Sequence, residues 1–146
     1  MAHNKLNVFS MIMGLVMVVA SASADAAADG DSLQQVVERG KALFMTATFD
    51  GNGRHCNTCH KGGGTEMSEL PDGKKFASLS NAASIFPRYD KENHRVKTLQ
   101  DQVQHCVRNA LEGKPPAYDS AEMTELVSYV TSLSQGKPVD MDGMPQ

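Results

Sequence analysis

Large apolar side chains are scarce in this sequence. The chain has 146 residues, it contains no tryptophan, and only 5% of its residues are aromatic. A small domain with so few bulky side chains has difficulty building a sufficient core from its own residues. We therefore expect a large apolar cofactor to fill the centre of the fold.

An excess of positive charge is also missing. The formal net charge is -3 at pH 7. Binding to nucleic acid depends on dense neutralisation of phosphates by Lys and Arg side chains. The acidic balance of this chain therefore excludes nucleic acid as the expected partner.

A hydrophobic run long enough to span a bilayer is not found either. Residues 1–24 carry one positive charge at Lys5, then an apolar stretch over about residues 8–20, then small residues that end at Ala24. About 13 apolar residues fall short of the ~20 that a membrane-spanning helix needs. The three-part pattern is typical of a cleaved secretory signal peptide, with an uncleaved membrane anchor as the alternative. We expect a signal peptide over residues 1–24, a single domain over residues 25–146, export to the periplasm, and no stable membrane anchor after cleavage.

Cysteine is rare, with three residues in the chain, and two of them share one short loop. The segment GNGRHCNTCHKGGG, residues 51–64, holds Cys56, Cys59 and His60. A zinc site needs four ligands, and no second cysteine pair supplies the rest. A thioredoxin-like dithiol would follow a strand, whereas this loop is rich in glycine. C-x-x-C-H is the attachment signature of haem c, in which two thioethers hold the porphyrin and the adjacent imidazole binds the iron. The sequence therefore predicts one haem c, attached through Cys56 and Cys59, with His60 as an axial ligand.

Three helices are predicted around this loop. Apolar residues at helical spacing predict a helix within residues 31–47, capped by Asp31 or Ser32, and a helix within residues 98–113. The pattern continues with a third helix within residues 119–138, opened by a capping box of Asp119 and Glu122. No segment alternates convincingly as a strand, so we expect an all-α, single-domain cytochrome c fold around the haem.

Further residues set the boundaries and packing of these helices. Thr98 with Asp101 three residues later predicts a second capping box, and Gly113 and Gly136 are expected to end their helices. Gly40, one turn before Phe44, is expected to let the first helix cross the last helix closely.

The second axial ligand of the iron is not obvious among the methionines. Met67 is too near the attachment motif, and Met123 belongs to the apolar face of the last helix. Two more methionines lie in the C-terminal tail, at positions 141 and 144. None of the four stands out as a ligand.

Cys106 is a further candidate for that position. It lies at the edge of an apolar helical face, near Leu99, while His105 points to the opposite side. Periodicity alone leaves open whether Cys106 binds iron, is a small buried hydrophobic residue, or forms an intermolecular disulfide. We expect His55 and His94 to lie at the surface.

The segments FPRYDKENHRVKTLQDQVQHCVRNALEGKPP and YDSAEMTELVSYVTSLSQGKPVDMDG, together with the motif at Cys56–His60, resemble the haem domains of the SoxA thiosulfate-oxidising cytochromes and of thiosulfate dehydrogenase. The resemblance implies that Cys106 is the second axial ligand, which would give His/Cys coordination. Those proteins contain two haem-domain units or pair with a separate cytochrome subunit, and this chain has one motif. The resemblance therefore implies a redox partner protein, and a second cytochrome subunit is one candidate for it.

These features favour electron transfer over a stand-alone enzyme. We expect a low-potential carrier of single electrons within a complex, because a thiolate ligand stabilises ferric iron. Two alternatives stay open: a catalytic subunit that oxidises thiosulfate through Cys106, and a haem sensor that binds NO or CO.

Arg108, two residues after Cys106, is expected to point away from the haem. Five basic residues flank the haem loop, either as a docking rim or as solvated side chains: Arg54, Lys61, Lys74, Lys75 and Arg88.

Overall fold

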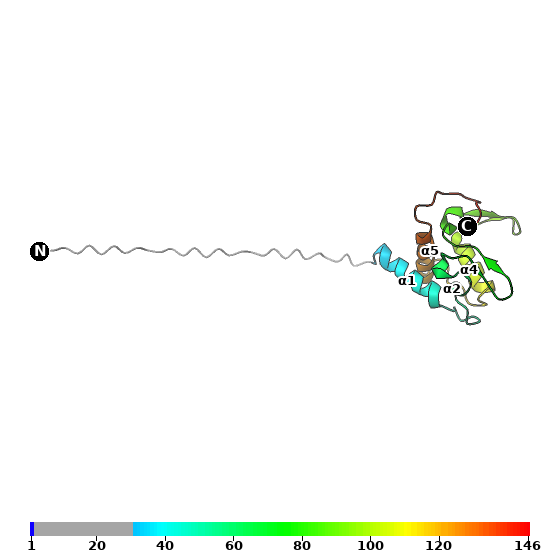
Figure 1. Cartoon of the computed structure of the whole chain (residues 1–146), viewed down its shortest axis with the longest axis horizontal. Coiled ribbons are helices and arrows are strands. Elements are labelled where there is room, and N and C mark those ends of the chain that lie inside the picture. Colours follow the sequence, from blue (N-terminus) through cyan, green and yellow to red (C-terminus); the bar gives the residue numbers. More distant parts are fainter. Residues whose placement is uncertain (2–30) are drawn as a thin grey trace.

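Figure 1 shows the computed structural model, which describes Met1 and residues 31–146. Three longer helices form its body: α1 (Leu33–Thr46), α4 (Leu99–Asn109) and α5 (Ala121–Leu133). The shorter elements are α2 (Cys56–Cys59), the 3-10 helix η1 (Gly62–Gly64), α3 (Ala82–Ile85) and the strands β1 (Ser68–Glu69), β2 (Lys75–Phe76), β3 (Arg88–Asp90) and β4 (Arg95–Lys97). The predicted signal peptide over residues 1–24 lies outside the described residues. Among the helices within the described residues, none is long and apolar enough to cross a membrane.

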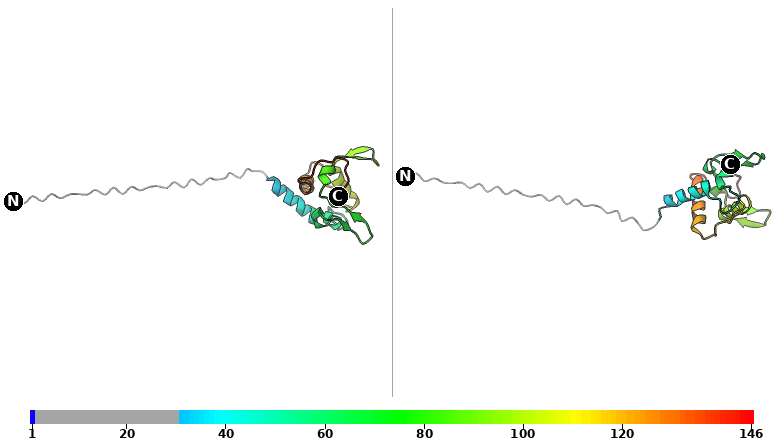
Figure 2. Two further views of the ribbon diagram at one scale, coloured as in Figure 1. Left: turned by 45° about the horizontal axis from the view of Figure 1, so that its top comes forward. Right: turned by 90° about the horizontal axis from the view of Figure 1, so that it is seen from below.

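Helices α1 and α5 cross at a glycine. A Cβ added at Gly40 would collide with the backbone carbonyl of Glu125 and the side chain of Tyr129. Only the smallest residue permits this close approach, which confirms the role predicted for Gly40. Two further views show the same crossing from other sides (Figure 2).

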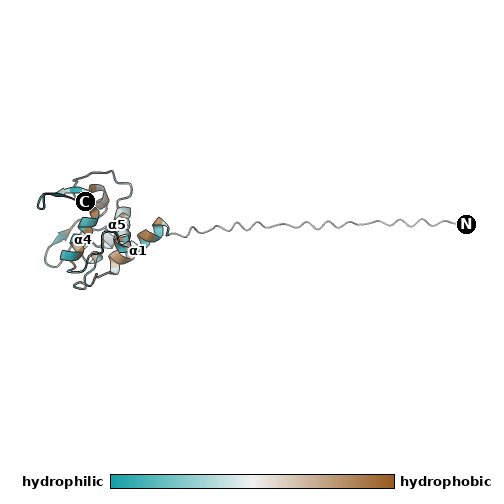
Figure 3. Cartoon of the chain, turned by 180° about the vertical axis from the view of Figure 1, so that it is seen from behind, coloured by the Kyte–Doolittle hydropathy of each residue, from teal (hydrophilic) through white to brown (hydrophobic). Residues whose placement is uncertain are grey.

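The hydrophobic core is built on this crossing. The ring of Phe44 on α1 meets the ring of Tyr129 on α5 edge to face, with centroids 5.3 Å apart. Leu99 from α4 and Ala82 from α3 pack into the same cluster. Figure 3 shows hydrophobic and hydrophilic stretches alternating along α1 and α4, as expected for helices with one buried side.

Two of the three predicted helix starts are confirmed. Ser32 caps α1 and forms a capping box with Gln35. Thr98 caps α4, with the predicted reciprocal contacts to Asp101. The predicted capping box of Asp119 and Glu122 is wrong, because Ser120 is the N-cap of α5 and its hydroxyl accepts a hydrogen bond from Met123 N at 3.1 Å.

The prediction of an all-α fold is also wrong. Strands β1 and β2 form one antiparallel hairpin, and β3 and β4 form a second one, with Tyr89 opposite Val96. Each strand has two or three residues, too few to show the alternation by which strands are recognised in sequence. Turn chemistry forms the second hairpin instead, since the carboxylate of Asp90 accepts hydrogen bonds from the N–H groups of Glu92 and Asn93. Both hairpins project from the helical body (Figure 2).

The C-terminal segment after α5 returns to the helical body. Asp140 N donates to Ser84 O at 2.8 Å, which holds the segment to α3. The buried side chain of Asn81 donates to Met144 O at 2.9 Å and accepts from Gln146 N at 3.2 Å. These bonds bring the C terminus over the body of the domain, where Figure 1 marks it.

Candidate cofactor site

The loop around the cysteine pair is held to α5. His60 N donates to Cys56 O at 3.0 Å, which closes the single turn of α2. The hydroxyl of Tyr129 donates to Gly63 O at 2.8 Å, and this bond is buried. Gly63 has a φ of 66°, and a Cβ there would lie 2.6 Å from the Tyr129 hydroxyl. A glycine at this position therefore allows the loop to turn directly against the core.

The four residues singled out from the sequence line one cavity. Cys56 and Cys59 reach it from α2, His60 from the position directly after α2, and Cys106 from α4. The cavity has a volume of about 360 Å³, within the range of cofactor sites. Its apolar wall includes Phe44, Phe76, Ile85, Phe86, Leu99 and Leu126. Such a wall suits a large apolar cofactor, as the scarcity of bulky side chains predicts.

The arrangement of these four residues differs from that of a bare metal site. Within residues 31–146, no group of three or more His, Cys, Asp or Glu side chains is placed to hold a metal ion directly. A zinc cage, by contrast, brings four ligands to one ion. Ligands spread around an apolar cavity fit a macrocycle that carries its own metal and needs only axial donors from the protein.

His60 is suited to binding a metal. Its ring packs edge to face on Phe76, with centroids 5.5 Å apart. Burial lowers the pKa of the His60 imidazole below its ordinary value, opposed by the backbone of Ala77. The neutral imidazole that this favours is the form that ligates metals.

Two imidazole nitrogens in the described residues are buried without a hydrogen-bond partner. They are Nδ1 of His60 and Nδ1 of His55. Buried polar atoms normally have partners, so an orphaned pair beside an apolar cavity is a sign of a bound group. His55 is half-buried and lines the cavity, so its predicted surface position is wrong. Its position directly before Cys56 was the sequence signal for this proximity.

The three cysteine side chains are buried or half-buried. All three cysteines of the chain are described and unpaired, and Cys59 is only 7% exposed. Burial, with the nearby Cys106 thiol, raises the pKa of Cys56 to about 12. Burial also raises the pKa of Cys106, opposed by the Gln102 amide and by Lys97. An uncharged thioether suits the buried sulfur atoms of Cys56 and Cys59, and a metal at Cys106 would offset the cost of burying a thiolate there.

Helix α4 positions Cys106 as its periodicity predicts. Cys106 is half-buried at the cavity, whereas His105 and Arg108 are exposed. The side-chain amide of Gln102 donates to Cys106 Sγ at 3.2 Å. Sequence reasoning did not single out Gln102, although its place one turn before Cys106 on the same face was a usable signal.

The four methionines considered as ligands in the sequence do not line the cavity. Met123 is 1% exposed and belongs to the core, while Met67 is 74% exposed. Met141 and Met144 in the tail are also exposed, and their neighbour Pro145 lines the cavity. No methionine is among the residues that line the cavity within the described part of the chain.

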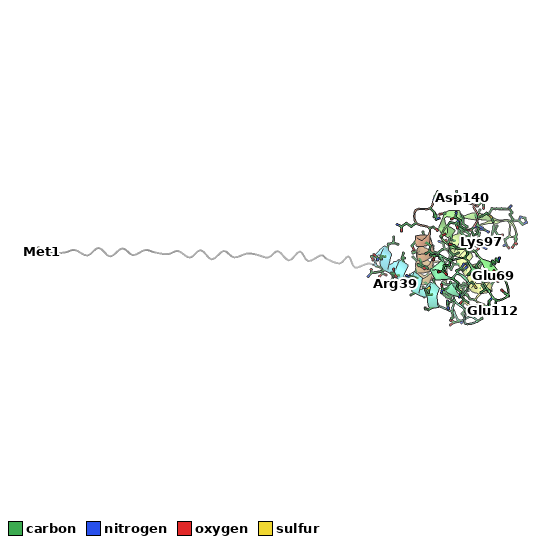
Figure 4. The ribbon with its side chains drawn as sticks, in the orientation of Figure 1. Met1, Arg39, Glu69, Lys97, Glu112 and Asp140 are labelled. Atoms are coloured by element: carbon green, nitrogen blue, oxygen red, sulfur yellow. The ribbon has the colours of Figure 1, made fainter. Side chains whose placement is uncertain are left out.

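Two of the five flanking basic residues lie at the cavity. Arg88 and the largely exposed Lys75 line it, whereas Arg54, Lys61 and Lys74 do not. Lys97, which the sequence did not single out, pairs with Asp90 across the second hairpin at 3.9 Å. In the view of Figure 4, Lys97 lies on the side of the molecule that also carries Glu69, away from Arg39 on α1.

Comparison with known proteins shows a clear likeness. Residues 39–139 match the model of the SoxA/TsdA cytochrome c domain. The thiosulfate dehydrogenase of Stutzerimonas stutzeri (strain A1501) is 31% identical over 113 residues, which covers 74% of this chain and 34% of that protein. The L-cysteine S-thiosulfotransferase subunit SoxA of Pseudaminobacter salicylatoxidans is 27% identical over 106 residues, covering 73% of this chain and 32% of that protein.

A solved structure shares the fold. Thiosulfate dehydrogenase (TsdBA) from Marichromatium purpuratum superposes with a TM-score of 0.63 at 26% identity, covering 80% of this chain and 26% of that one. The chain thus spans about a third or less of the length of these relatives. The cytochrome c part of the predicted fold is therefore confirmed, while its all-α part is wrong.

Proposed function

Because the chain belongs to the SoxA/TsdA cytochrome c domain family, we propose that it is a mono-haem electron-transfer protein with His60 and Cys106 as axial ligands. A cytochrome c domain implies covalently attached haem c, and the single C-x-x-C-H motif supports one haem in this chain. The observation that carries the proposal is the convergence of Cys56, Cys59, His60 and Cys106 on one apolar cavity.

Each of these residues has a distinct role in the proposal. The thiols of Cys56 and Cys59 would form the two thioether bonds to the haem, and the neutral His60 imidazole would bind the iron. Cys106 on α4 would supply a thiolate to the iron, and such a ligand would favour the ferric state and keep the potential low. When bound, the haem would supply a one-electron couple, and the apolar wall that includes Leu99 and Phe76 would cover part of it.

The attachment can be tested by composition. We expect the chain, produced in a host that attaches haem c, to contain one haem that stays bound under denaturing conditions. A Cys56→Ala/Cys59→Ala variant should lose covalent haem, whereas Cys106→Ala should retain it. A redox titration of the wild type should then fit a single one-electron transition. Two transitions, or covalent haem in the double variant, would overturn the proposal.

A second candidate function is oxidation of thiosulfate. Two of the three similar proteins described above are named as thiosulfate dehydrogenases, and the Cys106 sulfur lies in the same cavity as Lys75 and Arg88, whose charges suit an anion. Joining two thiosulfate ions through a sulfur–sulfur bond releases two electrons, and one haem accepts one. This function therefore requires a second electron acceptor in a partner protein. Reduction of an artificial acceptor by thiosulfate, lost in Cys106→Ala, would support it.

A redox partner and export complete the proposal. One relative is named as a subunit, SoxA, and the solved structure is named as the assembly TsdBA, so a second cytochrome subunit is the partner that we propose. The pattern of residues 1–24 supports export to the periplasm and cleavage after Ala24. The mass of the secreted protein tests the cleavage, since the mature chain should begin at Asp25.

A further inference from the structure

The structure gives Cys106 a hydrogen-bond donor of its own. Gln102 Nε2 donates to Cys106 Sγ at 3.2 Å, within the range of a hydrogen bond to sulfur. The two residues are one turn apart on α4, so their side chains lie on the same face of the helix. Both line the cavity.

Among the cavity residues of α4 near Cys106, Gln102 is the one whose side chain can donate a hydrogen bond to the sulfur. The neighbouring cavity residues on α4, Leu99 and Val103, are apolar and offer no hydrogen bond to the sulfur. Gln102 is half-buried and carries no charge, so it can approach the sulfur without the desolvation cost of a buried cation. Lys97 acts on Cys106 through its charge, and it is already paired with Asp90.

We infer that Gln102 is a positioning residue for Cys106, which fixes the direction of the sulfur and sets the reduction potential through this hydrogen bond. The inference rests on the proposed ligation by Cys106. Groups that hydrogen-bond to a metal ligand orient it and adjust its donor strength.

The direction of the effect follows from charge. Reduction adds one electron and leaves the ligand sulfur more negative in the ferrous state. A donor to that sulfur therefore stabilises the ferrous state more than the ferric state. Loss of the Gln102 donor should shift the equilibrium toward the ferric state and lower the potential, and the amide takes up no proton in this step.

The test uses the holoprotein and two substitutions with opposite expected signs. Gln102→Leu removes the donor at similar volume, and we expect about a tenfold shift toward the ferric form, or ~59 mV for one electron. Gln102→Lys supplies a charged donor at the same place, and we expect a higher potential than that of the wild type. The control Gln100→Leu is half-buried on the same helix but does not line the cavity, and it should leave the potential unchanged.

Ferric EPR separates the inference from its premise. The wild type and Gln102→Leu should both show a low-spin thiolate signature, with shifted g values in the variant. A wild type without that signature would overturn the ligation and the inference together. A wild type with the signature, but with Gln102→Leu at the wild-type potential, would overturn the inference alone. If Gln102→Leu fails to load haem, Gln102→Lys decides, and a potential at or below that of the wild type would contradict the role of Gln102.

Discussion

At the scale of single residues, the contact between Gly63 and Tyr129 joins the haem loop to the core. The Tyr129 hydroxyl donates to the Gly63 carbonyl, and the ring of the same tyrosine packs on Phe44. One side chain thus connects the attachment loop with the crossing of α1 and α5. The position of His60 therefore depends on the packing of two distant helices.

Gly63→Ala tests this connection against a matched glycine. The substitution forces a side chain into a backbone conformation with φ of 66°, and its Cβ would meet the Tyr129 hydroxyl. Gly53→Ala meets a similar φ of 84° with no atom within 4 Å. The backbone strain is about 1–2 kcal/mol in both, so Gly63→Ala should lower the free energy of unfolding by more than Gly53→Ala does.

The measurement is denaturant unfolding of the holoproteins, with Tyr129→Phe as a third variant. Removal of the hydroxyl should relieve part of the clash, so the double variant Gly63→Ala/Tyr129→Phe should be more stable than additivity predicts. If the two glycine substitutions lower the free energy of unfolding equally, the contact with Tyr129 does not contribute to stability.

At the scale of the elements, the crossing of α1 and α5 depends on Gly40. An added methyl group would contact the α5 backbone at Glu125, which cannot move as a side chain can. Although alanine is a better helix former by about 1 kcal/mol, overpacking costs about 1–3 kcal/mol. We expect Gly40→Ala to lower the melting temperature of the holoprotein by several degrees. The exposed neighbour variant Lys41→Ala should melt close to the wild type, and a rise in melting temperature for Gly40→Ala would contradict the close crossing.

The N-terminus of α4 should give the domain a sensitivity to acid. Hydrogen bonds from Thr98, led by its backbone N–H, lower the pKa of Asp101 below its ordinary value. The stability that this carboxylate contributes is present above its unfolded pKa of about 3.9 and is lost as the pH falls through its lower folded pKa. In unfolding experiments from pH 7 to pH 2, Asp101→Asn should therefore differ from the wild type near neutrality and converge with it in acid. A constant difference across this range would argue against the assignment.

The elements also show which parts of the fold are readable from sequence. The start of α1 was predictable because a capping residue, Ser32, precedes the first apolar residues at helical spacing, and the start of α4 because Thr98 and Asp101 form a capping box. The two hairpins were not, since turns and tertiary packing form strands of two or three residues. In the candidate site, a motif, helical periodicity and a family resemblance singled out Cys56, Cys59, His60 and Cys106, and all four line one cavity. The position of His55 at the cavity and the hydrogen bond from Gln102 to Cys106 depend on how the loop before α2 packs against α4. Helical periodicity in the sequence carries no information on that packing.

At the scale of the whole molecule, the cofactor cavity should dominate stability. Apolar side chains from α1, α3, α4 and α5 face a volume of about 360 Å³. A haem in this cavity would be covered by the apolar wall, so a chain without haem would lose that apolar burial, which is the main favourable contribution to folding. We expect the Cys56→Ala/Cys59→Ala protein, freed of haem, to lack a cooperative thermal transition and a near-ultraviolet circular dichroism signal. A haem-free protein that melts cooperatively near the temperature of the holoprotein would contradict this view.

The ligation by Cys106 is the central claim, and one comparison tests it most directly. Ferric EPR and optical spectra would be recorded for the wild-type holoprotein and for Cys106→Ala. We expect a low-spin thiolate signature in the wild type that the variant loses, while covalent haem is retained in both. If the two spectra agree, Cys106 is a packing residue of α4, and the proposed His/Cys coordination is wrong.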